Sequence, residues 1–167
     1  MDISKLPIGD NAPEEFNVVI EVPMGGNPVK YELDKDSGAM FVDRFLHTAM
    51  HYPCNYGFIP HTLSDDGDPV DAAVLGQHVV APGVVIPSRP IGVLMMEDES
   101  GVDEKILCVP VHRLHPYYEK VESYTDVRPI LVEQIAHFFT PYQDLADGTR
   151  VKVLGRAGPE RAEDLVP

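Results

Sequence analysis

Residues 16–42, FNVVIEVPMGGNPVKYELDKDSGAMFV, contain three short apolar runs separated by turn-forming residues. The runs cover residues 16–22, 29–33 and 39–42. Their length and their content of Val, Ile, Phe and Tyr are typical of β-strands. The polar segment between the last two runs ends in Gly38, which can adopt a positive φ angle. This stretch therefore predicts consecutive strands, of which the last two form a hairpin.

Runs of the same kind continue to the end of the chain, and one segment has helical spacing. The further strands are predicted at residues 70–75, 83–86, 91–96, 106–109 and 150–154. The helix is predicted to begin near Asp126, as N-cap, and to end near Pro141. Its apolar side is formed by Leu131, Ile135, Phe138 and Tyr142. The pattern predicts a mainly β fold of the α+β class, a closed or nearly closed barrel with one substantial helix.

Length and charge restrict the possible functions. The chain has 167 residues, which predicts a single domain spanning residues 1–167. Its net charge of -14, from 27 acidic and 13 basic residues, argues against nucleic acid or an anionic membrane as a partner. The first residues do not resemble a targeting signal, and no run approaches the ~20 apolar residues of a membrane span. We therefore expect a cytoplasmic protein.

The densest chemical signal is SDDGDPVD at residues 64–71, where four carboxylates fall within seven residues: Asp65, Asp66, Asp68 and Asp71. Clustered carboxylates repel one another, and hard divalent cations such as Mg²⁺ offset that repulsion while taking oxygen ligands. Gly67 and Pro69 favour a shaped turn. Taken alone, the segment could equally be a solvated acidic loop.

A second acidic group follows another predicted strand. It contains Asp98, Glu99, Asp103 and Glu104, with Lys105 beside it. Two such loops could converge at one end of a barrel and build a site for several metal ions, although the sequence leaves their proximity open. Strand alternation also places Lys30 and Glu32 on one face, and Arg44 follows the next strand. These last residues could equally form surface ion pairs.

In combination, these residues resemble the soluble family I inorganic pyrophosphatases of bacterial type. The resembling segments are VIEVP at 19–23, KYE at 30–32, FVDR at 41–44, YPCNYG at 52–57, DGDPVD at 66–71 and IAHFF at 135–139. The resemblance covers nearly the whole chain. It implies a five-stranded, OB-like barrel with helices, pyrophosphate as substrate, several Mg²⁺ ions per active site and often a homohexamer.

The resemblance also implies roles for individual residues. Asp66, Asp71 and Asp103 would bind the activating metal ions, Asp98 and Glu99 would serve additional ions, and Glu32 would be a nearby outer ligand. Asp68 would be the general base. The phosphate contacts would be Lys30, Arg44, Tyr56, Lys105 and Tyr142, with Glu21 and Tyr52 completing the polar lining. At position 143 many relatives have Lys, whereas this chain has Gln143.

The implied reaction is direct attack on pyrophosphate by a water or hydroxide that the metal ions activate, giving two phosphates.

A different enzyme class has to be considered, because DGDPV at residues 66–70 fits the short DxDx[TV] pattern of haloacid-dehalogenase-like phosphatases. Those enzymes need an alternating β/α fold, which this sequence does not predict. Two non-enzymatic classes also need consideration. The net charge disfavours an OB-like nucleic-acid module, and a Ca²⁺-binding protein is disfavoured because the sequence has no EF-hand loop.

Overall fold

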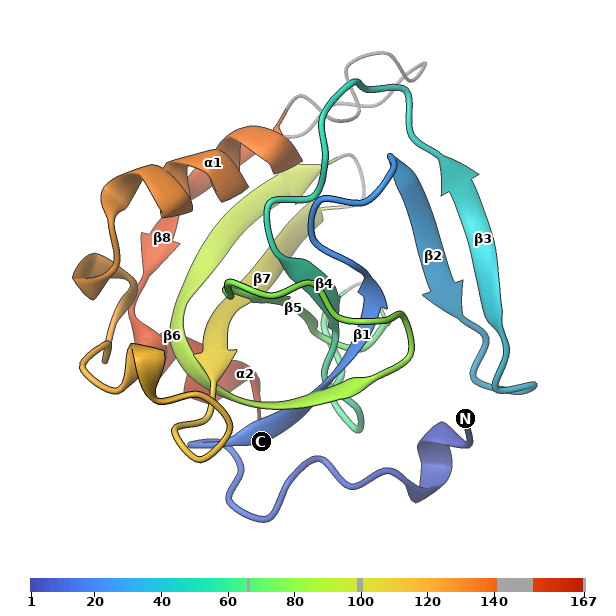
Figure 1. The fold of residues 1–167 in the computed structure, drawn as a ribbon, viewed down its shortest axis with the longest axis horizontal. Helices are drawn as coiled ribbons and strands as arrows, with labels where there is room; N and C mark the ends of the chain where they lie inside the picture. Colours follow the sequence, from blue (N-terminus) through green and yellow to red (C-terminus); the bar gives the residue numbers. More distant parts are fainter. Residues whose placement is uncertain (66, 99–100, 141–151, 167) are drawn as a thin grey trace.

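The computed structural model describes residues 1–65, 67–98, 101–140 and 152–166, and its centre is a closed ring of five strands (Figure 1). The order around the ring is β1 (Phe16–Val22), β4 (Asn55–Phe58), β5 (Asp71–Val74), β7 (Gly101–Pro110) and β6 (Val85–Asp98), which pairs again with β1. The β5–β7 pairing is parallel, and the other ring pairings are antiparallel. This ring confirms the predicted fold class and contradicts an alternating β/α fold.

Ring closure depends on a close approach between β1 and β4. Gly57 lies opposite Ile20 in the antiparallel register. A Cβ atom on Gly57 would lie 1.7 Å from the carbonyl oxygen of Val19, a distance that no side chain can accept. Glycine is therefore required here by space, because the backbone of one strand fills the position of its side chain.

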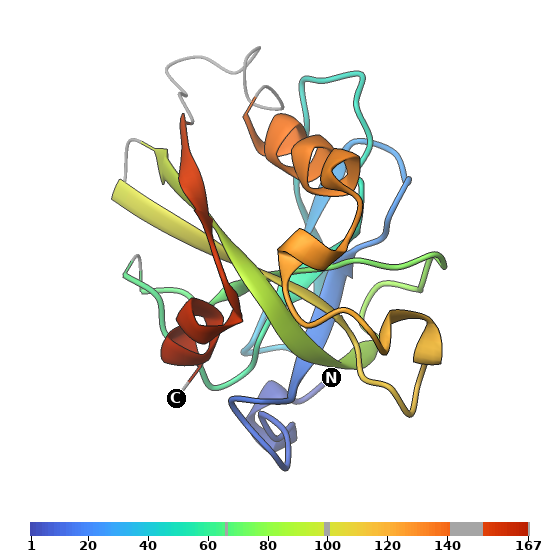
Figure 2. The same cartoon turned by 90° about the vertical axis from the view of Figure 1, so that its left-hand side faces the viewer.

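The remaining elements extend the ring or cover it. Strand β8 (Lys152–Ala157) pairs with β6, and β2 (Val29–Leu33) with β3 (Met40–Phe45) forms a separate hairpin beside the ring. Helix α1 (Pro129–Phe139) lies in the upper part and α2 (Pro159–Leu165) in the lower part of both views (Figure 2). The short 3₁₀ helices are η1 (Ile3–Lys5), η2 (Pro116–Tyr118) and η3 (Tyr124–Asp126).

Most predicted strands are confirmed, with two differences. The runs at 16–22 and 29–33 match β1 and β2, and the hairpin loop contains Gly38 at φ 75°. The runs at 83–86 and 91–96 belong to one long strand, because β6 accommodates Pro90 at a register shift, where a missing N–H is tolerated. Strand β4 was not predicted, since Asn55–Phe58 is short and contains Gly57.

The predicted helix start was wrong. Asp126 belongs to η3, where its carboxylate accepts the backbone N–H groups of Glu122 and Ser123. Helix α1 begins at Pro129, whose fixed φ suits a first helical position. The predicted apolar side is confirmed for Ile135 and Phe138, which are buried, but Leu131 is 40% exposed. The buried side is completed by Val132, Ala136 and Phe139, and Tyr142 lies outside the described residues.

Candidate active site

One face of β5 and β7 changes from apolar to charged along each strand. Side chains alternate between the faces of a strand, so Asp71 shares a face with Ala73, and Lys105 with Leu107. Ala73 and Leu107 belong to the apolar cluster that α1 covers. The parallel register sets Asp71 opposite Lys105. The charged residues therefore lie on the continuation of the face that packs against α1.

The ammonium group of Lys105 is the centre of this charged group. Its Nζ lies 3.1 Å from Asp71 Oδ2 and 3.0 Å from Asp103 Oδ2, and it donates a hydrogen bond of 2.6 Å to the Tyr56 hydroxyl. Lys105 is only 5% exposed. Burial alone would lower the pKa of Lys105, but Asp71, Tyr56 and Asp103 outweigh it and hold that pKa well above its ordinary value. The lysine therefore stays charged.

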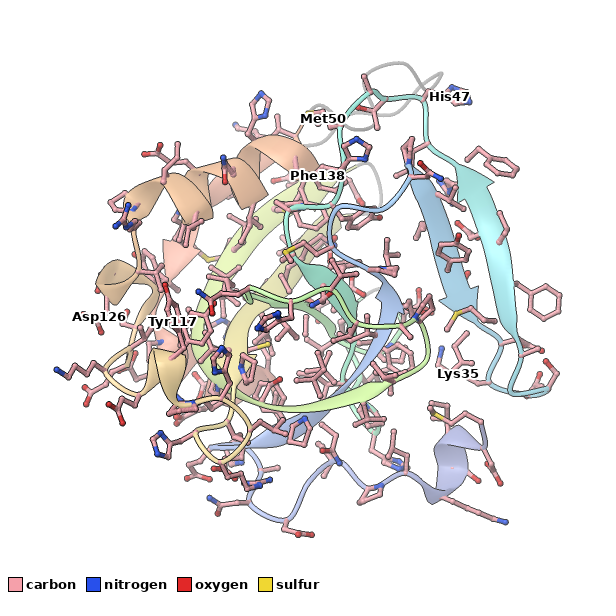
Figure 3. All side chains as sticks on the ribbon, viewed as in Figure 1. Lys35, His47, Met50, Tyr117, Asp126 and Phe138 are labelled. Atoms are coloured by element: carbon pink, nitrogen blue, oxygen red, sulfur yellow. The ribbon has the colours of Figure 1, made fainter. Side chains whose placement is uncertain are left out.

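Aromatic rings enclose this ammonium. Its Nζ lies 5.0 Å from the ring centroid of Tyr56 and 4.9 Å from that of Phe139. Tyr52 packs behind them, with its centroid 5.5 Å from Tyr56 and 4.5 Å from Phe138. Figure 3 shows Phe138 on the side of α1 that faces the strands. Burial and the nearby Asp71 raise the pKa of Tyr56 well above its ordinary value, so its hydroxyl stays protonated.

Glu21 and Glu32 connect this group to the hairpin. Glu21 Oε2 accepts the backbone N–H of Leu33 at 2.8 Å, which joins β1 to the end of β2. Burial raises the pKa of Glu21 to about 7, with a further contribution from the negative charges of Asp71 and Glu32. The Glu21 carboxyl therefore titrates near neutral pH.

The hairpin carries the cationic residues. Lys30 lies opposite Arg44, whereas Tyr31 lies opposite Val42, so Asp43 is left as an extra residue in β3. A bulge of this kind redirects a side chain, and Asp43 Oδ2 lies 2.8 Å from Arg44 Nε and 3.7 Å from Lys30 Nζ. Burial would raise the pKa of Asp43, but Arg44 and Lys30 outweigh it and hold that pKa below its ordinary value. Asp43 thus keeps two cations side by side.

Other predicted residues lie further along these strands and turns. Asp68 is exposed in the turn before β5, where its carbonyl oxygen accepts the backbone N–H of Ser64 at 2.8 Å. Asp98 ends β6 opposite Gly101. Glu104 turns away from Lys105 and binds Arg161 of α2 through contacts of 2.9 and 2.7 Å, so the second acidic group divides between two faces.

The remaining predicted residues are Asp66, Glu99, Tyr142 and Gln143, all outside the described residues. Within the described ranges, no three His, Cys, Asp or Glu side chains converge closely enough to hold a metal ion. Asp71 and Asp103, whose proximity the sequence leaves open, come together through their shared contact with Lys105.

Sequence reasoning missed two residues, Asp43 and Phe139. Asp43 belongs to the resembling segment FVDR at 41–44, but its contacts with two cations follow from the bulge, which depends on strand pairing. Phe139 looks like any core residue of a helix, and its position over Lys105 depends on how α1 packs on β7. No local signal in the sequence identifies either contact.

The fold and the charged group together define a class of protein. It has a closed five-stranded sheet that carries carboxylates, a buried lysine and a cationic hairpin, and such a site is suited to binding cations and phosphate-like anions. Comparisons with known proteins specify the family. The sequence model of the inorganic pyrophosphatase family matches residues 18–167, and the chain belongs to this family of hydrolases.

Individual relatives agree along almost the whole chain. The inorganic pyrophosphatase of Rhodospirillum rubrum is 60% identical over 166 residues, which is 99% of this chain and 93% of the relative. The solved structure of the inorganic pyrophosphatase from Helicobacter pylori matches with a TM-score of 0.92 at 44% identity, covering 96% of this chain and 94% of that one. The structure from Thermus thermophilus gives a TM-score of 0.92 at 42% identity, covering 98% and 94%. Among the described residues, no helix is long and apolar enough to cross a membrane.

Proposed function

We propose that this chain hydrolyses pyrophosphate to two phosphates with the help of Mg²⁺. Membership of the inorganic pyrophosphatase family supports the substrate. The observation that carries the proposal is the convergence of Asp71 and Asp103 on Lys105, which sets two carboxylates beside a permanent cation. Carboxylates alone would repel pyrophosphate, and cations alone would not bind metal ions, so the combination is suited to a metal–pyrophosphate complex.

The residues present fit Mg²⁺ as the ion. The proposed ligands are all carboxylates: Asp66, Asp71 and Asp103 for the activating ions, Asp98 and Glu99 for additional ions, and Glu32 as an outer ligand. Oxygen donors of this kind are those that Mg²⁺ prefers. Burial raises the pKa of Glu21 to about 7, with a smaller contribution from the negative charges of Asp71 and Glu32, and a bound cation would favour its charged form. When bound, Mg²⁺ supplies a Lewis acid that lowers the pKa of water and neutralises phosphate charge.

The protein's own residues have three tasks in this proposal. Asp68 accepts a proton from the attacking water, whose oxygen bonds to one phosphorus while the bridging oxygen leaves with the electron pair of the broken P–O bond. Phosphate oxygens are bound by cations and phenols: Lys30, Arg44, Tyr56, Lys105 and Tyr142. Glu21 and Tyr52 line the site and support the positions of these groups. Direct attack leaves no covalent enzyme intermediate.

We also propose the assembly that the family resemblance implies and the location that the sequence predicts. The chain would act as one inorganic pyrophosphatase domain in the cytoplasm, and it would assemble as a homo-oligomer, a hexamer in the bacterial pattern. Sedimentation velocity of the purified chain measures this state directly.

The proposed function is tested by phosphate release from pyrophosphate. Mg²⁺ is expected to support turnover, Ca²⁺ to support much less because it is larger and coordinates more flexibly, and a chelator to abolish turnover. Full activity after exhaustive removal of divalent ions would contradict the metal requirement. Recovery of a labelled aspartyl phosphate from the protein would contradict direct attack by water.

A further inference from the structure

Phe139, the last residue of α1, lies directly against the charged group. Its side chain is 1% exposed, and its ring centroid is 4.9 Å from Lys105 Nζ. The ring also packs on Tyr56, with centroids 5.2 Å apart, and on Phe138 at 5.1 Å. Phe139 is therefore held firmly by its neighbours, and its ring position is fixed relative to the lysine.

The contacts of Lys105 explain why a ring is useful at this place. An ammonium group has three N–H donors, and three oxygen groups surround this one: Tyr56, Asp71 and Asp103. The Phe139 ring lies 4.9 Å from the ammonium, whereas Tyr56 meets it through the hydroxyl at the edge of its ring. The face of an aromatic ring carries negative potential, so it attracts a cation and at the same time keeps water away from it.

We propose that Phe139 is a positioning residue, whose ring holds the Lys105 ammonium in place and thereby fixes the separation of Asp71 and Asp103. The inference rests on the proposed function, in which these two carboxylates bind Mg²⁺. The Phe139 side chain has no oxygen or nitrogen atom with which to bind a metal ion or a phosphate. It acts through the lysine and links the packing of α1 to the geometry of the carboxylates.

The expected effect on metal binding has a definite sign. Weakening the ring's attraction leaves the charge of Lys105 unchanged, so the long-range repulsion between lysine and metal ion stays the same. What changes is the freedom of the ammonium and of the two carboxylates that it contacts. Ligands held in place bind more tightly than mobile ones, so the Mg²⁺ affinity is expected to fall as the attraction weakens.

Fluorinated phenylalanines at position 139 provide the sharpest test. Successive fluorine atoms remove negative potential from the ring face while the ring remains close to its original size. Calorimetry without substrate measures Mg²⁺ binding for rings with none to three fluorine atoms. The affinity is expected to fall stepwise, by about threefold to tenfold across the series. Exchange of the Lys105 ammonium protons with water, followed by NMR on protein with ¹⁵N-labelled lysine, is expected to accelerate in the same order.

The same series at position 138 is the matched control. Phe138 lies on the same helix, is 2% exposed, and packs on Tyr52 with centroids 4.5 Å apart. A role in packing alone predicts equal responses at both positions, whereas the positioning role predicts a stepwise response only at 139. The thermal unfolding midpoint of each variant shows whether the ring substitution disturbs the fold.

The two proposals fail in different ways. A flat Mg²⁺ affinity across the series at position 139, or equal trends at 139 and 138, overturns the positioning role while leaving the proposed function intact. Absence of Mg²⁺ binding and of pyrophosphate turnover in the unsubstituted protein overturns the proposed function itself. The stepwise loss at 139 alone, together with faster ammonium exchange, supports the inference.

Discussion

The Lys105 ammonium donates a hydrogen bond of 2.6 Å to the Tyr56 hydroxyl, which is itself buried. Tyr56→Phe removes the acceptor from a charged, enclosed donor, and in the proposed site it also removes a donor to phosphate. Hydrogen bonds to charged groups contribute about 1.5–3 kcal/mol, so kcat/KM for magnesium pyrophosphate is expected to fall by about tenfold to a hundredfold. Steady-state kinetics measures the loss. Tyr117→Phe, at a tyrosine that is 61% exposed, is the control and is expected to stay near the original value.

Replacing the buried cation exposes the repulsion between the carboxylates. Lys105→Met leaves Asp71 and Asp103 without their shared partner, and breaking a buried ion pair of this kind costs on the order of 3 kcal/mol. The free energy of unfolding, measured with denaturant in a chelator, is expected to fall by about that amount. Added Mg²⁺ is expected to recover more stability in the variant than in the original protein, because it neutralises the same carboxylates. The exposed Lys120→Met serves as control, and equal Mg²⁺ effects in all three proteins would contradict this account.

The metal-free protein is expected to lose stability as the pH rises toward neutrality. Burial raises the pKa of Glu21 from 4.5 to about 7, so the folded state binds this proton more tightly than the unfolded state. The stabilising contribution is therefore complete below the unfolded pKa near 4.5 and is lost as pH rises through about 7. Glu21→Gln removes this dependence and is expected to be the more stable protein at pH 8, by on the order of 2 kcal/mol.

Unfolding midpoints of both proteins between pH 5 and pH 8, in a chelator, check this prediction. Parallel pH profiles for the two proteins would show that Glu21 does not titrate in this range.

Asp68→Asn is expected to preserve the fold and to remove most of the activity. The side chain is exposed, and the contacts with Ser64 use the backbone carbonyl oxygen, which the substitution keeps. Loss of a general base lowers turnover by about 10²- to 10⁴-fold. Asp65→Asn, in the same acidic segment, is the matched control, while Asp71→Asn is expected to change the Mg²⁺ dependence as well as the rate. Near-normal turnover of a folded Asp68→Asn protein would exclude Asp68 as the base.

The parts of the fold that local pattern determines could be predicted. The strand at 16–22 and the hairpin around Gly38 follow from apolar alternation and from turn chemistry. Strand β4 could not be predicted, because its few residues include Gly57, and only ring closure explains why a glycine stands there. The predicted start of α1 was wrong because Asp126 is the third residue of a different, shorter helix, where it completes the capping box of Ser123.

The candidate site likewise has a part that local sequence predicts and a part that depends on strand pairing. Clustering along the sequence indicated Asp71, Asp103 and Lys105 as candidates, but their meeting depends on the parallel register of β5 and β7, which no local pattern encodes. Glu104 shared the acidic segment with Asp103 and proved to face the opposite way, toward Arg161. Strand alternation explains this difference once the first and last residues of β7 are known. The predicted roles of Asp66, Glu99 and Tyr142, which lie outside the described residues, stay predictions.

The parallel pairing of β5 with β7 also has a consequence for synthesis of the chain on the ribosome. Asp71 and Lys105 are 34 residues apart, and β6 lies between them. A nascent chain that has emerged only as far as β6 already holds β1, β4, β5 and the hairpin, yet it lacks β7 and with it Asp103 and Lys105. Contacts between distant segments form slowly because a long loop has to close first. The growing polypeptide therefore presents the acidic segment of residues 64–71 before Lys105, the partner of Asp71, has emerged, and divalent ions can neutralise those carboxylates during that interval.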